Sequence, residues 1–249
     1  MKAGVAVAIG LIEALKESGI RLRIAQMGLR WIDVHVTGRM AHAGRAHLGI
    51  DSAHIMSRIV DKLKVHIASL PHEDPILGKA RFTCGVFHAG VATNVVPPTA
   101  DAKFDVRIVP PMEIGDVIPL VEKIASEVIK DFPGATFSIT GLGAPRPPVQ
   151  ADDDSLIVTG IRSAYQSISG SPIPFGGADG HEAYTDASMV AALTNSRSCT
   201  VFGPGSTDQA HTADEFVRIS ELELVCQVMW KLVQDWGSTH SSLTKKKVG

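Results

Sequence analysis

Aromatic residues make up only 5% of this 249-residue chain, and cysteine occurs three times. Cys84, Cys199 and Cys226 are far apart, and none forms a CxxC or zinc-knuckle spacing, which favours reduced thiols in a cytoplasmic protein. No apolar stretch approaches the roughly 20 residues that span a membrane. The formal net charge is only −2, and the basic residues are spread along the chain, so a nucleic-acid-binding surface is not indicated.

Hydrophobic residues are plentiful at 45% of the chain, and charged residues make up 20%. A chain of this length can bury roughly three quarters of its unfolded surface, which is enough for one large core or two smaller ones. Residues 3–18 are apolar on most sides of a predicted helix. Glu13 and Lys16 interrupt that run, so a buried helix is favoured over a secretory leader.

The segment from 29 to 140 predicts the order strand, helix, strand, strand, helix, strand. Trp31, Asp33 and the next polar residues alternate with Ile32, Val34 and Val36, as expected for a strand with one face in a core. This order is the ferredoxin-like pattern. The predicted elements are a strand at 29–38, a helix at 52–70, strands at 80–87 and 100–109, a helix at 115–131 and a strand at 135–140.

Prolines and aspartates concentrate between 145 and 154, and this composition predicts a linker. The following part is expected to be mixed α/β. It contains predicted helices at 155–166, 185–193 and 219–236 and a short buried strand at 199–202.

Two histidines and one asparagine lie in predicted turns, where catalytic and binding residues are often found. His211 follows the glycine-rich turn of Gly203 and Gly205 and has the side chain of a zinc ligand, although a loop histidine is an equally plain interpretation. His42 lies in a turn and could donate a hydrogen bond to a developing oxyanion. Asn94 precedes a Val-Val-Pro sequence and is explained by turn formation alone.

Two further groups of charged residues leave alternatives open. Asp105 and Arg107 are two apart on one predicted strand and so share a face. They form either an internal ion pair or a site where the arginine binds a substrate carboxylate. A second polar group comprises Asp179, His181, Glu182 and Asp186; Asp179 and His181 have ligand-like spacing, but such a pair in a glycine-rich loop is more often only a loop.

Taken in order, these segments resemble the zinc-dependent peptidase and amidohydrolase family that includes acetylornithine deacetylase, succinyl-diaminopimelate desuccinylase and glutamate carboxypeptidases. The resemblance covers nearly the whole chain. It depends on the segments VTGRMAHAG at 36–44, NVVP at 94–97, DVR at 105–107, TDA at 185–187, FGPG at 202–205 and AHTADE at 210–215.

The resemblance implies a role for each matched residue. His211 matches a zinc ligand, and His42 matches a lid histidine that stabilises the oxyanion, often in the partner subunit's site. Asn94 and Arg107 match lid residues that hold substrate, and the loop of Gly203 and Gly205 matches a segment beside the metal. The implied cofactor is zinc or cobalt, the substrate an N-acyl amino acid or small peptide, and the assembly a homodimer through the lid domain.

The chain also departs from the family pattern. The family's His-x-Asp motif, its bridging aspartate and its Glu-Glu pair have no counterpart here. We therefore expect an incomplete zinc-peptidase catalytic domain over 1–23 and 146–249, joined to a ferredoxin-like lid and dimerisation domain over 24–145. With one matched ligand, metal should be held weakly or not at all, and this chain alone should be inactive. The alternative function is a non-catalytic relative that dimerises or binds carboxylates.

Overall fold

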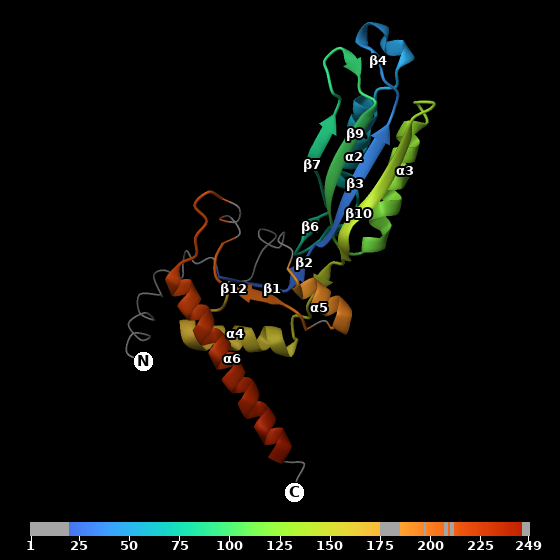
Figure 1. The fold of residues 1–249 in the computed structure, drawn as a ribbon. Helices are drawn as coiled ribbons and strands as arrows, with labels where there is room; N and C mark the ends of the chain where they lie inside the picture. Colours follow the sequence, from blue (N-terminus) through green and yellow to red (C-terminus); the bar gives the residue numbers. More distant parts are fainter. Residues whose placement is uncertain (1–19, 175–184, 197, 207–208, 210–211, 246–249) are drawn as a thin grey trace. The chain divides into compact units, whose positions relative to one another are not determined.

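The computed structural model describes residues 20–174, 185–196, 198–206, 209 and 212–245. The chain divides into two compact units (Figure 1), of which unit 1 comprises Met1–Gln26 with Val149–Gly249 and unit 2 comprises Met27–Pro148. The predicted boundaries fall at 23/24 and 145/146, three residues before the observed ones in each case. The predicted helix at 3–18 lies outside the described residues.

Unit 2 is a four-stranded antiparallel sheet with two helices on one face. The strand order is β10-β3-β9-β7, so the first and third long strands of the unit occupy the centre, as in a ferredoxin-like fold. Its elements are β3 (Gly28–Thr37), β4 (Ala41–His42), the 3₁₀ helix η2 (Ala43–Leu48), α2 (Ser52–Ala68), β5 (Glu73–Asp74), β6 (Gly78–Lys79), β7 (Arg81–Ala89), β8 (Val95–Val96), β9 (Thr99–Ile108), η3 (Ile114–Asp116), α3 (Val117–Ile129) and β10 (Thr136–Arg146).

The core of unit 2 lies between the sheet and helices α2 and α3. The predicted alternation in β3 is confirmed, because Ile32, Val34 and Val36 are fully buried. Phe104 of β9 is also buried, and its ring meets Phe82 of β7 edge-on with a centroid distance of 5.0 Å. The opposite sheet face carries the polar residues of each strand, so one face of the sheet holds the fold together and the other meets solvent.

The described part of unit 1 contains two short antiparallel strand pairs and three helices. Strand β1 pairs with β12, and β2 pairs with β11. Helix α4 packs on α6. The elements are β1 (Arg21–Arg23), β2 (Ala25–Gln26), β11 (Val149–Gln150), α4 (Leu156–Ser169), α5 (Ala187–Thr194), β12 (Val201–Gly203) and α6 (Ile219–Lys245).

Several element boundaries differ from the sequence prediction. Strand β10 continues to Arg146 and β11 follows at Val149, so much of the predicted linker is paired backbone. Helix α6 runs to Lys245, nine residues beyond its predicted end. The composition of this segment did not reveal the pairing, because the hydrogen bonds to β3 and β2 are made by backbone N–H and C=O groups and do not depend on the side chains.

Gly38 offers a test of how tightly the end of the sheet is packed. A Cβ at Gly38 would lie 2.1 Å from the carbonyl oxygen of Ile50, and backbone cannot move aside as a side chain does. A Cβ at Gly85 meets no atom within 4 Å. We expect Gly38→Ala to lower the free energy of unfolding by about 1–3 kcal/mol or more, whereas Gly85→Ala leaves it nearly unchanged. Urea unfolding, monitored by circular dichroism, measures both free energies. Equal unfolding midpoints for the two variants would contradict the close contact between Gly38 and Ile50.

Candidate functional site

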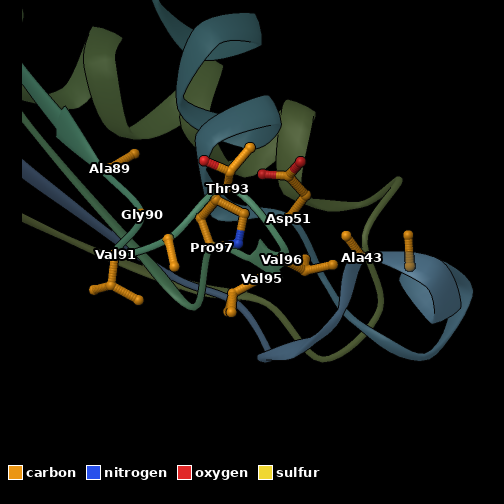
Figure 2. Close-up of a pocket in the computed structure, with 11 residues that line it drawn as sticks. Ala43, Asp51, Ala89, Gly90, Val91, Thr93, Val95, Val96 and Pro97 are labelled. Atoms are coloured by element: carbon orange, nitrogen blue, oxygen red, sulfur yellow. The ribbon is translucent and has the colours of Figure 1, made fainter.

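The end of unit 2 that lies beyond Gly38 forms a cavity of about 590 Å³. Figure 2 shows small and apolar residues around it, including Ala43 from η2 and Val95 from β8, with the polar side chains of Asp51 and Thr93. Asp51 also begins α2, where its carboxylate accepts a hydrogen bond from the backbone N–H of His54 over 3.0 Å. We call this region the tip cavity; it is lined by Ala43, Ala46, Asp51, Ala89, Gly90, Val91, Ala92, Thr93, Val95, Val96 and Pro97.

His42 is held at the tip by backbone contacts on both sides. Strand β4 pairs with β8, which puts His42 opposite Val95. The backbone N–H of Gly44 donates to His42 Nδ1 over 3.0 Å. A ring nitrogen that accepts a hydrogen bond carries no proton, so the proton of neutral His42 lies on Nε2. The exposed ring therefore presents an N–H donor, which is the form needed to stabilise an oxyanion.

Asn94 lies beside His42, as the predicted site requires. The backbone carbonyl oxygen of Asn94 accepts a hydrogen bond of 2.9 Å from the backbone N–H of Ala43. The structure thus brings together two predicted site residues that are 52 positions apart in the sequence. The pairing of β4 with β8 was not predicted, because two-residue strands carry no periodic signal.

Arg107 is not near this pair within one copy of unit 2. Strand β9 leaves the tip at Thr99 and reaches Arg107 eight residues later, which corresponds to roughly 27 Å of extended strand. Arg107 makes a two-pronged ion pair with Asp105, with N–O distances of 2.6 and 3.0 Å. Of the two predicted interpretations, the internal ion pair is present. A substrate-binding role for Arg107 stays a prediction.

The surroundings of Arg107 are nevertheless rich in positive charge. Arg81 of β7 is directly opposite Arg107 across the sheet. Arg146 lies over the Trp31 ring at 5.1 Å, and the Trp31 indole N–H donates to Asp105 over 3.0 Å. Like charges opposite each other destabilise a sheet unless anions accompany them. At this end of the outer sheet face, Asp105 supplies a negative charge to Arg107.

The predicted glycine loop belongs to unit 1. Gly203 ends β12, and Gly205 adopts a φ of 89°, which few residues other than glycine tolerate. The backbone N–H of Gly205 donates to the buried carboxylate of Glu221 over 2.8 Å. Glu221 was missed by the sequence analysis, because a single glutamate in a helix resembles a solvent-facing residue.

Gln26 is a second buried polar residue that the sequence did not single out. Its side-chain amide donates to Thr185 Oγ1 over 2.8 Å, and its oxygen accepts from the Thr185 backbone N–H over 3.2 Å. These bonds fix the start of the TDA segment to β2. Such a contact joins residues 159 apart, so local sequence patterns carry no sign of it.

The predicted metal site is not formed by the residues that the structure describes. No three His, Cys, Asp or Glu side chains gather to hold an ion within that part of the chain. His211, Asp179, His181 and Glu182 lie outside the described residues. The described donor set does not fit zinc, which needs at least three protein ligands in a catalytic site.

Comparison with known proteins identifies unit 2. Residues 24–133 match the family model of the peptidase dimerisation domain. This segment is a peptidase dimerisation domain. No helix in the described part of the chain is long and apolar enough to span a bilayer.

Curated relatives of the dimerisation domain and its flanking segments are amide hydrolases, which confirms the predicted resemblance. N-acetyl-L-citrulline deacetylase of Xanthomonas campestris is 27% identical over 205 residues, covering 80% of this chain and 52% of the relative. A probable succinyl-diaminopimelate desuccinylase of Staphylococcus epidermidis is 27% identical over 210 residues, covering 74% and 50%. The chain therefore spans about half the length of the curated relatives it matches.

Solved structures show the same fold. A tripeptidase from Staphylococcus aureus superposes with a TM-score of 0.66 at 18% identity, covering 85% of this chain and 52% of that one. A metallo-carboxypeptidase from Sulfolobus solfataricus gives 0.65 at 16%, covering 86% and 59%. The predicted fold class, an α/β peptidase domain with a ferredoxin-like dimerisation domain, is confirmed.

Proposed function

We propose that this chain contributes a dimerising, substrate-binding part to metal-dependent hydrolysis of the amide bond of N-acyl amino acids or small peptides, a reaction that needs metal ligands beyond the single matched one, His211. The proposed assembly is a homodimer, and both copies contribute to each substrate site. The observation that carries this proposal is the dimerisation domain with its prepared histidine, His42. The relatives are deacetylases and desuccinylases, which supports this substrate class.

His42 is the proposed oxyanion donor. When the amide carbonyl is attacked, negative charge grows on its oxygen, and the Nε2–H of His42 stabilises that charge by a hydrogen bond. The bond from Gly44 keeps the proton on Nε2 before substrate arrives. Asn94, one residue beyond the tip cavity's Thr93, is the proposed second polar contact to substrate.

The length of strand β9 in unit 2, the predicted lid domain, supports a dimer. An extended N-acyl amino acid is about 10 Å long, the length of three residues. His42 and Arg107 of one copy are separated by roughly 27 Å of strand, so one copy does not place both on the same substrate. Two copies remove this conflict, because His42 of one copy can meet the Arg107 site of its partner.

The β7 edge is the proposed dimer surface. Strands β7 and β10 are the two edges of the sheet, and an unpaired edge is a template for pairing with another strand. Both edge strands have a register shift, between Leu142 and Arg146 in β10 and between Cys84 and Val86 in β7. Beside β7, α2 carries Ser57, Val60 and Lys64 on the flank away from Arg58, which binds Asp131 just after α3.

Arg107 is the proposed contact for the substrate carboxylate, and this role can be tested by binding. We expect N-acetyl-L-citrulline to raise the melting temperature of the chain, because a ligand that binds only the folded state stabilises it. At ten times the dissociation constant the gain is about 1.4 kcal/mol. Arg107→Leu should abolish this shift, and the matching amide, which lacks the carboxylate, should give none.

Arg58→Leu is the matched control for that experiment. It also removes an arginine from an Arg–Asp ion pair, with an N–O distance of 2.8 Å, but on the helical layer rather than the outer sheet face. The control should keep the ligand-induced shift. Equal shifts in wild type and Arg107→Leu would count against the carboxylate site.

A non-catalytic, carboxylate-binding dimer is the second candidate. It is favoured by one observation, that the described residues contain no cluster of three possible metal ligands. The two functions predict the same dimer and the same carboxylate binding. They differ in zinc affinity and hydrolysis.

A further inference from the structure

Helix α6 has two apolar faces, and one of them is buried against other described residues of unit 1. Leu224, Val228 and Leu232 are buried, together with the carboxylate of Glu221 that holds Gly205. Helix α4 packs against α6. This face accounts for the attachment of α6 to unit 1.

The second face is an apolar stripe exposed to solvent. Its members follow one another at alternating intervals of three and four residues, which is the spacing of a seam between paired helices. Trp230 lies beside the stripe and is 67% exposed, while Ile219 and Val233 are 74% and 59% exposed. The α6 stripe consists of Ile219, Leu222, Cys226, Met229, Val233 and Trp236, flanked by Trp230.

The stripe is large enough to support a specific contact. Its two tryptophans would each expose about 150–250 Å² if fully accessible, and with the exposed fractions of the other apolar members the stripe offers at most roughly 600–700 Å² for each copy. Two such stripes would bury up to about 1,300 Å², above the lower bound of about 1,200 Å² for specific interfaces. The stripe contains no charged side chain, so two identical stripes meet without repulsion between like charges.

We propose that the α6 stripe is a second self-association surface, occupied by α6 of another copy of this chain. It lies in unit 1 and is separate from the proposed dimer contact at β7, so it goes beyond the proposed function. The groove between α4 and α6 borders the stripe at Trp236. It has a volume of about 360 Å³ and an apolar wall formed by Leu156 and Leu232, which suits a large side chain of the second copy.

Val233→Glu tests the surface, and Gln234→Glu is its matched control. Both substitutions add the same charge at adjacent exposed positions, but about 100° apart on the helix, so only the first lies on the stripe. The test is made in the Gly85→Pro variant, in which the β7 contact is removed. Sedimentation velocity should still show association, weakened at least tenfold by Val233→Glu and unchanged by Gln234→Glu.

Cys226 provides a second, independent measurement. It lies near the middle of the stripe, so two fully overlapping stripes place the paired Cys226 residues about 10 Å apart in either orientation. A short bifunctional maleimide should therefore cross-link two copies, and Cys226→Ser should abolish the product. Cys84 is half-buried, and burial raises the pKa of its thiol, so it reacts more slowly than the exposed Cys226.

Three results would overturn the proposal. The first is a Gly85→Pro chain that stays monomeric at all concentrations reached. The second is equal association of the Val233→Glu and Gln234→Glu variants. The third is a monomer whose Cys226 resists labelling, which would mean that other residues of the same chain cover the stripe. None of these results depends on whether the β7 contact or the carboxylate site exists.

Discussion

Proline at position 85 is expected to dissociate the dimer that forms through the β7 edge. Gly85 has no partner in β9, because the register shifts between Cys84 and Val86. A proline there stands at a bulge of an edge strand, where proline is tolerated, but it lacks the backbone N–H and adds a ring to the strand. Each proline should cost about 1–1.5 kcal/mol at the contact.

A two-fold symmetric interface contains the substituted strand twice. The total loss is therefore roughly 2–3 kcal/mol, or about 30- to 150-fold in the dissociation constant. Sedimentation at micromolar concentration, with Val233→Glu present to remove association through α6, measures the change. Circular dichroism checks that unit 2 remains folded.

Gly85→Ala is the control for this prediction. It fills the same open space and keeps the N–H, so the dimer should persist. If the proline variant dimerises as strongly as the alanine variant, β7 is not the contact. If the proposed composite site is also correct, Gly85→Pro should weaken binding of N-acetyl-L-citrulline, since His42 and Arg107 then no longer meet.

The sequence predicted the ferredoxin-like unit well because its strands alternate strictly. In β9, Ala100, Phe104 and Val106 are buried, while Asp101 and Lys103 face solvent. That period of two assigns a face to every residue without knowledge of the neighbouring strand. The helices α2 and α3 were equally visible from their apolar spacing.

The contacts that build the tip and the glycine loop could not be predicted in this way. The bonds from Gly44 to His42, from Ala43 to Asn94 and from Gly205 to Glu221 each depend on how the backbone folds back. Motif matching predicted His42 and Asn94 as site residues without indicating that they are neighbours. It also grouped Arg107 with them, although strand length separates it from both within one copy.

Zinc is expected to bind this chain weakly, and this prediction separates the two candidate functions. A structural site with four ligands contributes about 10–16 kcal/mol. One ligand such as His211 then contributes about 3–4 kcal/mol, which corresponds to a millimolar dissociation constant. Calorimetric titration should therefore show affinity at least about 10⁴-fold below that of a complete site. N-acetyl-L-citrulline should not be hydrolysed in the presence of zinc or cobalt.

The opposite outcome is equally informative. Stoichiometric zinc binding in the micromolar range, lost in His211→Ala but retained in the exposed-surface control His72→Ala, would show that further residues of this chain complete the site. If hydrolysis accompanied that binding, His42→Ala should reduce kcat by about 10²–10³-fold, the usual effect of removing one oxyanion donor. Metal binding that leaves hydrolysis absent would instead favour the non-catalytic dimer. The number of protein ligands available to the ion decides between the two functions, because Arg107 binds and His42 stabilises charge, whereas activation of the attacking water needs the metal.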